Sequence, residues 1–219
     1  MRMRKKPYAE AELHSWPYFI QHPADHAGHW QEAFSAPRPL HLELGCGKGR
    51  FISIAAAQNP DKNYLGIDLK NEVLVVAKRN IEAAFAAAGA PLGNALIMSH
   101  DIERIDQIMI PADQVEAVYI NFPNPWPKAK HQKRRLTHTR QLEKYKPFLA
   151  PGAVLYFKTD DDDLFEDSLG YFEESGFSPI YLTRDAHKEA DLPFDIRTEH
   201  EDMFSEQGIP IKFLAAVQK

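Results

Sequence analysis

Hydrophobic residues follow two patterns in this chain of 219 residues, one typical of strands and one typical of helices, and the two patterns alternate along the sequence. Leu40, Leu42 and Leu44 predict a buried strand, whereas Val73, Val76 and Ile81 lie near one face of a predicted helix. The expected strands span residues 40–44, 63–69, 95–99, 117–122, 153–158, 179–183 and 211–217, and the expected helices span 71–88, 137–149 and 164–175, with one more directly after the first strand. This alternation predicts βαβ units, and so an α/β fold with a doubly wound, mostly parallel sheet.

The first part of the chain lacks such periodicity and is interrupted by four prolines within residues 1–38. We predict a basic N-terminal arm there, with one short helix around Ala9–Trp16, followed by a single domain over residues 39–219. Three histidines between His22 and His29 could suggest zinc. No acid or cysteine is arranged to complete such a site, so we expect no metal.

Three glycines at alternate positions, Gly45, Gly47 and Gly49, follow the first strand. Glycine lets the backbone turn sharply and approach a ligand without a Cβ in the way. We therefore expect a nucleotide-like ligand over this turn. The spacing G-x-G-x-G differs from the dinucleotide motif G-x-G-x-x-G, and Lys48 is not followed by the Ser or Thr of a P-loop. Neither common phosphate-binding motif fits.

Two acids flank the glycine turn. Glu43 precedes the first glycine by two residues, where its carboxylate would repel a pyrophosphate and attract an ammonium group. Asp68 closes the next strand, and an acid at about this distance accepts hydrogen bonds from ribose hydroxyls in the Rossmann arrangement. S-adenosylmethionine carries an amino group, a sulfonium and a ribose but no phosphate. The pattern favours this cofactor over NAD and over a purely structural glycine turn.

Composition narrows the class of protein further. The 44% of hydrophobic residues suffices for one core, and no run approaches the roughly 18 apolar residues of a membrane span. The basic N-terminus is not followed by the apolar core of a signal peptide, and a single cysteine, Cys46, fits a reducing compartment. We expect a cytoplasmic protein that does not associate with membranes.

The formal net charge of −5 conceals a local excess of cations. Eight lysines or arginines and one acid lie between Lys128 and Lys146, and the first six residues contain four more basic side chains. Charge runs are commonly just solvated faces. Two basic clusters on an otherwise acidic protein instead favour a surface that binds a polyanion.

The loop after the fourth strand reads Asn121-Phe-Pro-Asn-Pro-Trp-Pro-Lys128. Its three prolines fix the backbone and lower the entropy lost in holding the loop still. Trp126 can stack on a base or fill the core, and Asn124 can bond a base edge or cap the turn. A base over this loop would have its phosphates beside Lys128. The loop and the glycine turn would meet at the carboxyl edge of a parallel sheet, where ligands bind.

Five motifs together resemble the bacterial tRNA (guanine-N7)-methyltransferase family over nearly the whole chain. They are Arg2-Met-Arg-Lys-Lys-Pro7, the turn from Glu43 to Gly49, Phe122-Pro-Asn-Pro-Trp-Pro-Lys128 with His131 and Lys133-Arg-Arg135, Phe157-Lys-Thr-Asp160, and Thr198-Glu-His-Glu201 before Phe204. The resemblance implies a class I methyltransferase with a Rossmann-like, seven-stranded sheet whose last strand is antiparallel. It also implies methyl transfer from S-adenosylmethionine to N7 of a guanine in the variable loop of tRNA, at position 46. No protein partner is implied, and a monomer and a homodimer are both compatible.

The resemblance, with the glycine turn and the basic run, assigns residues to each ligand. The expected cofactor site comprises Glu43, Gly45, Gly47, Gly49, Asp68, Asp101 and Asn124. The expected tRNA contacts are Lys128, Lys133, Arg134, Arg135, Asp160, Thr198 and Glu201. Methyl transfer would therefore take place between the glycine turn and the proline-rich loop.

Two positions depart from the family pattern. Asp68 stands where the family often has glutamate, and Asn124 where the loop normally has an aspartate regarded as catalytic. Guanine N7 bears a lone pair and no proton, so in-line transfer requires no base, and orientation can supply most of the acceleration. We expect Asn124 to orient the base through its side-chain oxygen. Asp160 would be the negative charge nearest to the methylated, cationic ring.

Two other functions stay open at this point. The chain could be a nucleic-acid methyltransferase that acts on an exocyclic amine, because such enzymes carry an [Asn/Asp]-Pro-Pro-aromatic loop after the same strand. It could also be a tRNA-binding paralogue that keeps the fold and has lost catalysis through Asn124.

Overall fold

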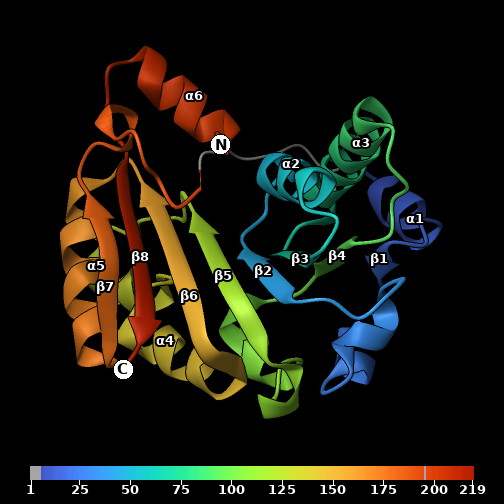
Figure 1. The fold of residues 1–219 in the computed structure, drawn as a ribbon, viewed down its shortest axis with the longest axis horizontal. Helices are drawn as coiled ribbons and strands as arrows, with labels where there is room; N and C mark the ends of the chain where they lie inside the picture. Colours follow the sequence, from blue (N-terminus) through green and yellow to red (C-terminus); the bar gives the residue numbers. More distant parts are fainter. Residues whose placement is uncertain (1–5, 195) are drawn as a thin grey trace.

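An eight-stranded sheet with helices on both faces is formed by residues 6–194 and 196–219, the parts of the chain that the computed structural model describes (Figure 1). The strands are β1 (Phe19–Ile20), β2 (Leu40–Leu44), β3 (Asn63–Asp68), β4 (Ala95–Ser99), β5 (Val115–Asn121), β6 (Leu149–Thr159), β7 (Phe177–Thr183) and β8 (Lys212–Gln218). The α-helices are α1 (Ala9–His14), α2 (Arg50–Gln58), α3 (Asn71–Ala88), α4 (Thr139–Tyr145), α5 (Asp162–Glu174) and α6 (Glu199–Glu206). The cations at positions 2, 4 and 5, predicted to belong to a basic arm, lie outside the described residues.

The strands are ordered β1-β4-β3-β2-β5-β6-β8-β7. All neighbours from β1 to β6 are parallel, and β8 is antiparallel to both β6 and β7. The predicted α/β fold with a mostly parallel sheet and an antiparallel last strand is confirmed. The described sheet has eight strands rather than seven because β1 adds to its edge. With two residues, β1 is too short to show the alternating pattern by which strands are recognised.

The direction in which the sheet grows reverses between β2 and β5. From β2 the chain adds β3 and β4 on one side, then returns to add β5 and β6 on the other. In open α/β sheets, ligands bind outside the carboxyl ends of the strands at such a switch point. Glu43 lies in β2 and Asn121 ends β5, so both face this crevice from opposite sides of the reversal.

Apolar side chains fill both faces of the sheet. One core lies between the sheet and helices α1, α2 and α3, and the other between the sheet and helices α4 and α5. Strand β2 lies between the two and is buried along its whole length. The first strand predicted from the sequence is thus the central element of the fold.

Residues before β2 also join the core, from Ala9 onward. Leu13 of α1 and Trp30 are fully buried, and the Trp30 indole Nε1 donates a hydrogen bond of 2.9 Å to the Ile108 carbonyl. The short helix predicted near the N-terminus is α1. It packs against α3, as contacts between the two helices and the ion pair of Lys78 with Glu12 indicate.

Two elements differ from the sequence-based expectation. Helix α4 ends at Tyr145 rather than Leu149, because Pro147 lies in a 3-10 turn and β6 begins at Leu149. Helix α6 was not predicted. Glu201 is its one buried residue, so the segment lacks the apolar stripe that identifies a helix. No helix among the described residues is long and apolar enough to cross a membrane.

The imidazole of His41 in β2 gives a testable pH dependence of stability. The ring is buried beside Tyr64, and Nδ1 lies 3.1 Å from the Tyr119 hydroxyl. Burial lowers the pKa of His41 to about 4, from 6.5. Between these values the unfolded chain binds a proton that the folded chain does not, so stability is lost as the pH falls through this window, by up to ~3 kcal/mol.

We expect His41→Gln to flatten the pH dependence of the free energy of unfolding between pH 6.5 and 4. Urea titrations at several pH values would measure this. His22→Gln, at an exposed position, provides the control. Equal pH slopes for wild type and His41→Gln would show that this histidine does not set the acid sensitivity.

Candidate active site

A cavity of about 630 Å³ opens at the carboxyl ends of β2 and β5. Its rim is the glycine turn with the start of α2, its floor includes Glu43 and Asn121, and its far wall is formed by Thr198 and residues of α6. Figure 1 shows α6 above this end of the sheet, on the side opposite α2. The cavity therefore lies where the topology predicts a ligand.

The glycine turn has the backbone geometry that its sequence suggested. Gly45, Gly47 and Gly49 all have positive φ, at +80°, +53° and +70°, in the region that side chains with a Cβ rarely adopt. The Gly47 amide donates a hydrogen bond of 3.0 Å to Oδ2 of Asp68. The glycine turn and Asp68, the two motifs predicted to bind the cofactor, are thus in direct contact. Asp68, the last residue of β3, holds the turn that follows β2.

Glu43 is buried, with 4% of its surface exposed, at the floor of the cavity. Its Oε1 accepts a hydrogen bond of 3.2 Å from Asn121 Nδ2, while Oε2 and Asn121 Oδ1 are buried without a partner among the described residues. Burial raises the pKa of Glu43 to about 8. Two unpaired acceptors, one of them belonging to a carboxyl group, call for a hydrogen-bond donor, and a cationic donor would also stabilise the ionised carboxylate. The ammonium group of S-adenosylmethionine satisfies this requirement, so the residues present fit this cofactor.

Asp68 and Asp101 lie at the ends of neighbouring strands, but neither lines the cavity. Besides the Gly47 amide, Asp68 accepts a hydrogen bond from the Lys70 amide through Oδ1, and burial raises its pKa. Each oxygen retains a lone pair that a ribose hydroxyl could use. Asp101 Oδ1 accepts from the Glu103 amide and caps the following 3-10 helix. The Asp68 carboxylate is thus held by the glycine turn and the Asp101 carboxylate by the 3-10 helix that follows it, and neither lines the cavity.

Asn124 is exposed in the proline-rich loop and does not line the cavity. Its Oδ1 accepts a hydrogen bond of 3.2 Å from the Trp126 amide, which is the turn-capping alternative. Trp126 lies outside the apolar cores, with its ring 5.7 Å from that of His131 and 5.2 Å from the Arg134 guanidinium. Of the two roles left open for Trp126, filling the core is not observed, and its indole instead lies beside the Arg134 guanidinium.

Arg135 departs from its predicted role in binding tRNA. Its side chain is 2% exposed, Nε donates to the Pro125 carbonyl at 2.7 Å, and Nη1 pairs with Asp167 of α5 at 2.5 Å. A guanidinium buried in this way anchors the proline-rich loop to α5 and is not available to phosphate. Lys128, Lys133 and Arg134, the other predicted contacts in this run, are exposed.

Thr198 and Glu201, also predicted to contact tRNA, have structural partners. Thr198 Oγ1 accepts from the Glu201 amide at 3.1 Å and caps α6, and Thr198 also lines the cavity. Glu201 is 1% exposed and pairs with Lys158 at 3.1 Å. Because its carboxylate is buried, the predicted contact between Glu201 and the substrate does not fit its position. Asp160 follows β6, and partial burial raises its pKa.

Asn121 and Phe122 are site residues that the sequence-based list lacks. Asn121 pairs with Glu43, and both residues line the cavity. The signal was available, since a polar residue that ends an apolar strand at the expected ligand edge is a candidate for binding. As for metals, residues 6–194 and 196–219 contain no group of three or more His, Cys, Asp or Glu side chains placed to hold an ion.

Antiparallel β8 between β6 and β7 distinguishes this sheet from an all-parallel dinucleotide-binding fold, and the unpaired acceptors at the switch point fit the ammonium group of a cationic ligand. Both properties are those of a class I S-adenosylmethionine-dependent methyltransferase, and the comparisons with known proteins show the same class. A family model described as "Putative methyltransferase" matches residues 37–214. The chain is 53% identical to a tRNA (guanine-N(7)-)-methyltransferase of Clostridium beijerinckii, covering 100% of this chain and 99% of the relative. It is 52% identical to one of Ruminiclostridium cellulolyticum, covering 100% and 93%. The chain belongs to the tRNA (guanine-N7)-methyltransferase family.

Solved structures with similar folds are methyltransferases of low sequence identity. An antibiotic-related methyltransferase has a TM-score of 0.58 at 16% identity, and the match covers 83% of this chain and 88% of that one. The 16S rRNA methyltransferase KamB has the same TM-score at 15% identity and the same coverage. At this level of identity the similarity supports the fold alone.

Proposed function

We propose that this protein transfers the methyl group of S-adenosylmethionine to N7 of a guanine in the variable loop of tRNA. The observation that carries the proposal is the 53% identity, over the full length of both chains, to a protein named for this activity. When bound, the cofactor supplies an electrophilic methyl group on a sulfonium. A cytoplasmic location, and the choice between monomer and homodimer, stay predictions.

The residues of the cavity would act mainly by binding and orientation. Glu43 and Asn121 offer acceptors to the cofactor's ammonium group, and Asp68 lies where it can accept from ribose hydroxyls. The guanine N7 lone pair needs no base, so the chain must align donor and acceptor and exclude water. The half-buried Asp160 carboxylate would stabilise the cationic ring that results.

The direct test is incubation of the purified protein with radiolabelled S-adenosylmethionine and unmodified tRNA transcripts, followed by identification of the labelled nucleoside. Label in 7-methylguanosine of the variable loop is expected, and alkaline ring opening distinguishes this product from an exocyclic methylamine. Label in an exocyclic amine would replace the proposal with the first alternative. Bound cofactor without transfer would favour the tRNA-binding paralogue.

Asn124→Asp tests whether position 124 orients the base. Aspartate can still accept the Trp126 amide and a hydrogen bond from guanine, so kcat is expected to stay within about tenfold of wild type. Asn124→Ala removes both hydrogen bonds and should lower kcat/KM by roughly tenfold or more. Single-turnover methylation assays would measure both variants. Loss of methylation in Asn124→Asp would exclude the orienting role.

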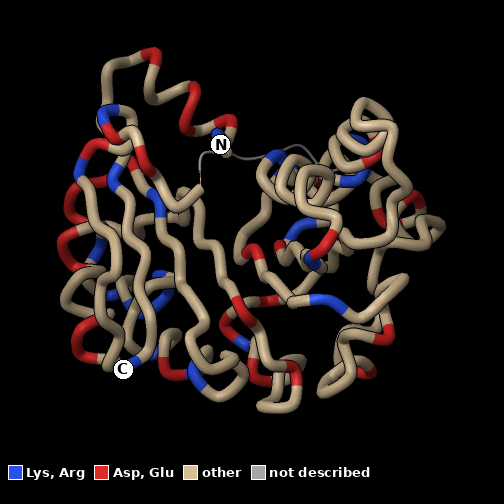
Figure 2. Tube along the Cα trace, viewed as in Figure 1, with Lys and Arg blue, Asp and Glu red and all other residues tan. Residues whose placement is uncertain are grey.

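The exposed cations of the loop supply the second test. The ion pair of Arg135 with Asp167 places α5 beside the proline-rich loop. Figure 2 shows acidic residues along α5, at the outer edge of the molecule. We expect Lys133→Ala with Arg134→Ala to weaken tRNA binding and reduce the slope of log K against log salt by about 1.5 to 2. Filter binding over a range of salt would measure this.

The matched control is Arg38→Ala with Lys62→Ala, which removes the same amount of charge. These two residues lie directly before β2 and β3, at the amino ends of the strands. We expect this control variant to leave the salt slope unchanged. A normal slope in the Lys133 and Arg134 variant would mean that these side chains do not contact phosphates.

A further inference from the structure

Helix α6 forms one wall of the cofactor cavity, and its apolar attachment to the rest of the molecule is through the partly buried Phe204, which packs against the cluster around Phe213 and lies 6.1 Å from the Phe122 ring. With its cap Thr198, it contributes four further lining residues, Glu199, His200, Met203 and Phe204. Met203 is nevertheless exposed, and Glu201 is the single residue of the helix that is buried. Besides this aromatic contact, the position of the wall depends on what holds the buried Glu201 carboxylate.

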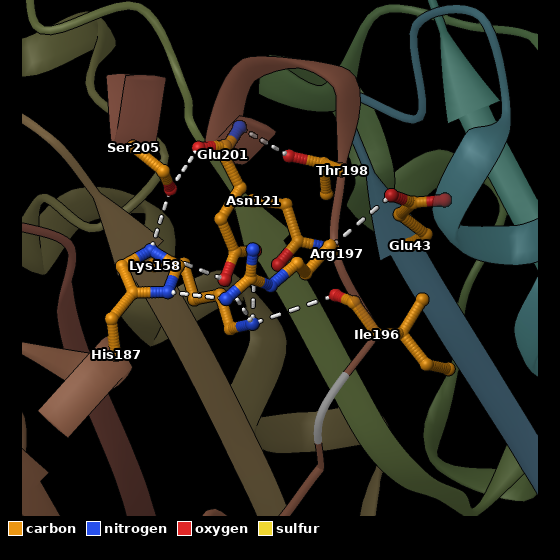
Figure 3. Close-up of polar contacts among 9 residues, drawn as sticks. All are labelled: Glu43, Asn121, Lys158, His187, Ile196, Arg197, Thr198, Glu201 and Ser205. Carbon is orange, nitrogen blue, oxygen red and sulfur yellow. Dashed lines mark hydrogen bonds and ion pairs between the residues drawn. The ribbon is translucent and has the colours of Figure 1, made fainter. Parts of the chain in front are cut away.

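Glu201 reaches a lysine in the interior of the sheet. Lys158 of β6 is completely buried, and its Nζ lies 3.1 Å from Glu201 Oε2, 3.4 Å from Oε1 and 3.5 Å from the Ile196 carbonyl (Figure 3). The ring of Phe194 covers the ammonium group at 4.7 Å. Separating a buried carboxylate from a buried ammonium held in this way would be costly.

The same lysine is adjacent to the floor of the cavity. Lys158 is paired in register with Asn121 on the neighbouring strand, and Asn121 binds Glu43. Figure 3 shows the resulting row of polar side chains, from Glu43 through Asn121 and Lys158 to Glu201. The floor and the wall of the cavity are thus connected through one residue of β6.

Other contacts of α6 are weaker or depend on this one. Glu199 pairs with Lys48 and Asp202 pairs with Arg50, but all four side chains are at least a third exposed, and such pairs contribute little. Ser205 Oγ donates to the Glu201 carbonyl and lies 2.8 Å from His187 Nε2. These contacts support the helix once Glu201 is in place.

We infer that Lys158 and Glu201 are positioning residues whose buried ion pair docks α6 as the wall of the cofactor cavity, and that Glu201 does not contact tRNA. The inference deepens the proposed function and rests on it only for the identity of the ligand. It assigns to Lys158 a role in cofactor binding, although the Lys158 side chain is not part of the cavity lining.

Glu201→Gln tests this inference through three measurements. Calorimetry with S-adenosylmethionine should show a Kd raised tenfold or more, while filter binding of tRNA without cofactor should be unchanged. Hydrogen exchange of amides 199–206 should accelerate at least tenfold, while exchange in β6 and β8 stays slow. Glu206→Gln makes the same chemical change at an exposed position of α6 and should alter none of the three.

The opposite pattern would overturn the inference: weaker tRNA binding with unchanged cofactor Kd and unchanged exchange in α6 would mean that Glu201 contacts the substrate. Because the exchange measurement involves neither ligand, it tests the docking of α6 even where the wild type methylates no tRNA.

A second variant covers the case in which Glu201→Gln does not fold. Lys158→Met with Glu201→Met removes both charges together, which buried ion pairs often tolerate. We expect it to fold with α6 docked, and to bind S-adenosylmethionine within about threefold of wild type, because positioning requires only that the helix stay in place. Loss of cofactor or tRNA binding with α6 still protected would show a direct role for one of the charges.

Discussion

Replacing Glu43 by glutamine is expected to weaken S-adenosylmethionine binding about a hundredfold and, at the same time, to stabilise the protein. Glutamine keeps an oxygen for Asn121 but loses the charge that pairs with the ligand's ammonium group. Loss of a charged hydrogen bond of about 3 kcal/mol corresponds to that factor. Isothermal titration calorimetry at pH 8 would measure it.

The gain in stability follows from the pKa of the buried carboxyl. The folded protein holds the Glu43 proton up to about pH 8, whereas the unfolded chain releases it near 4.5. Between these values the folded state binds more protons, so the free energy of unfolding falls as the pH rises. Glutamine has no proton to release, and the variant should be more stable than wild type by roughly 4 kcal/mol at pH 8.

Glu116→Gln provides the matched control, since it makes the same change at an exposed position of β5. We expect it to alter neither cofactor binding nor the pH dependence of unfolding. If Glu43→Gln bound the cofactor normally, Glu43 would not be the ammonium site. If its stability fell with rising pH as in the wild type, the carboxyl would titrate at an ordinary value.

Gly49→Ala is expected to destabilise the protein by about 2–4 kcal/mol. Gly49 has a φ of +70°, which costs a residue with a Cβ about 1 kcal/mol or more. An added Cβ would also lie 2.7 Å from the Ala77 Cβ and 3.0 Å from the Ala77 Cα, which overpacks the contact between α2 and α3. Urea unfolding would measure the change.

Gly89→Ala separates the two contributions. Gly89 ends α3 with a φ of +61°, and nothing lies within 4 Å of an added Cβ. Only the backbone cost applies there, so we expect a loss of about 1 kcal/mol. Equal losses in the two variants would mean that the turn moves away from α3 without cost.

The sequence predicted those parts of the site whose residues are special for local reasons. β2 was recognisable from Leu40, Leu42 and Leu44, all of which are buried, and the glycine turn because its positive φ angles require glycine. Glu43 and Asp68 could be placed because parallel strands end at one edge of the sheet. In these cases local sequence and tertiary structure agree.

The residues whose surroundings differ from the sequence-based expectation depend on contacts far along the chain. Arg135 belongs to a basic run, yet it is buried because Asp167, 32 positions later, pairs with it. Glu201 is buried because it meets Lys158, 43 positions earlier. A pattern of neighbouring residues carries no information on such partners, so a buried ion pair and an exposed binding residue look the same in sequence.

The place of β8 in the sheet has a consequence during synthesis. β8 pairs with β6 on one side and β7 on the other, yet it leaves the ribosome after both of them and after α6. Until residues 212–218 emerge, β6 and β7 have no strand between them, and the interior beside Lys158 lacks Phe213. The nascent chain can thus assemble the glycine turn early, whereas the wall of the cavity opposite it can be completed only after β8 has emerged.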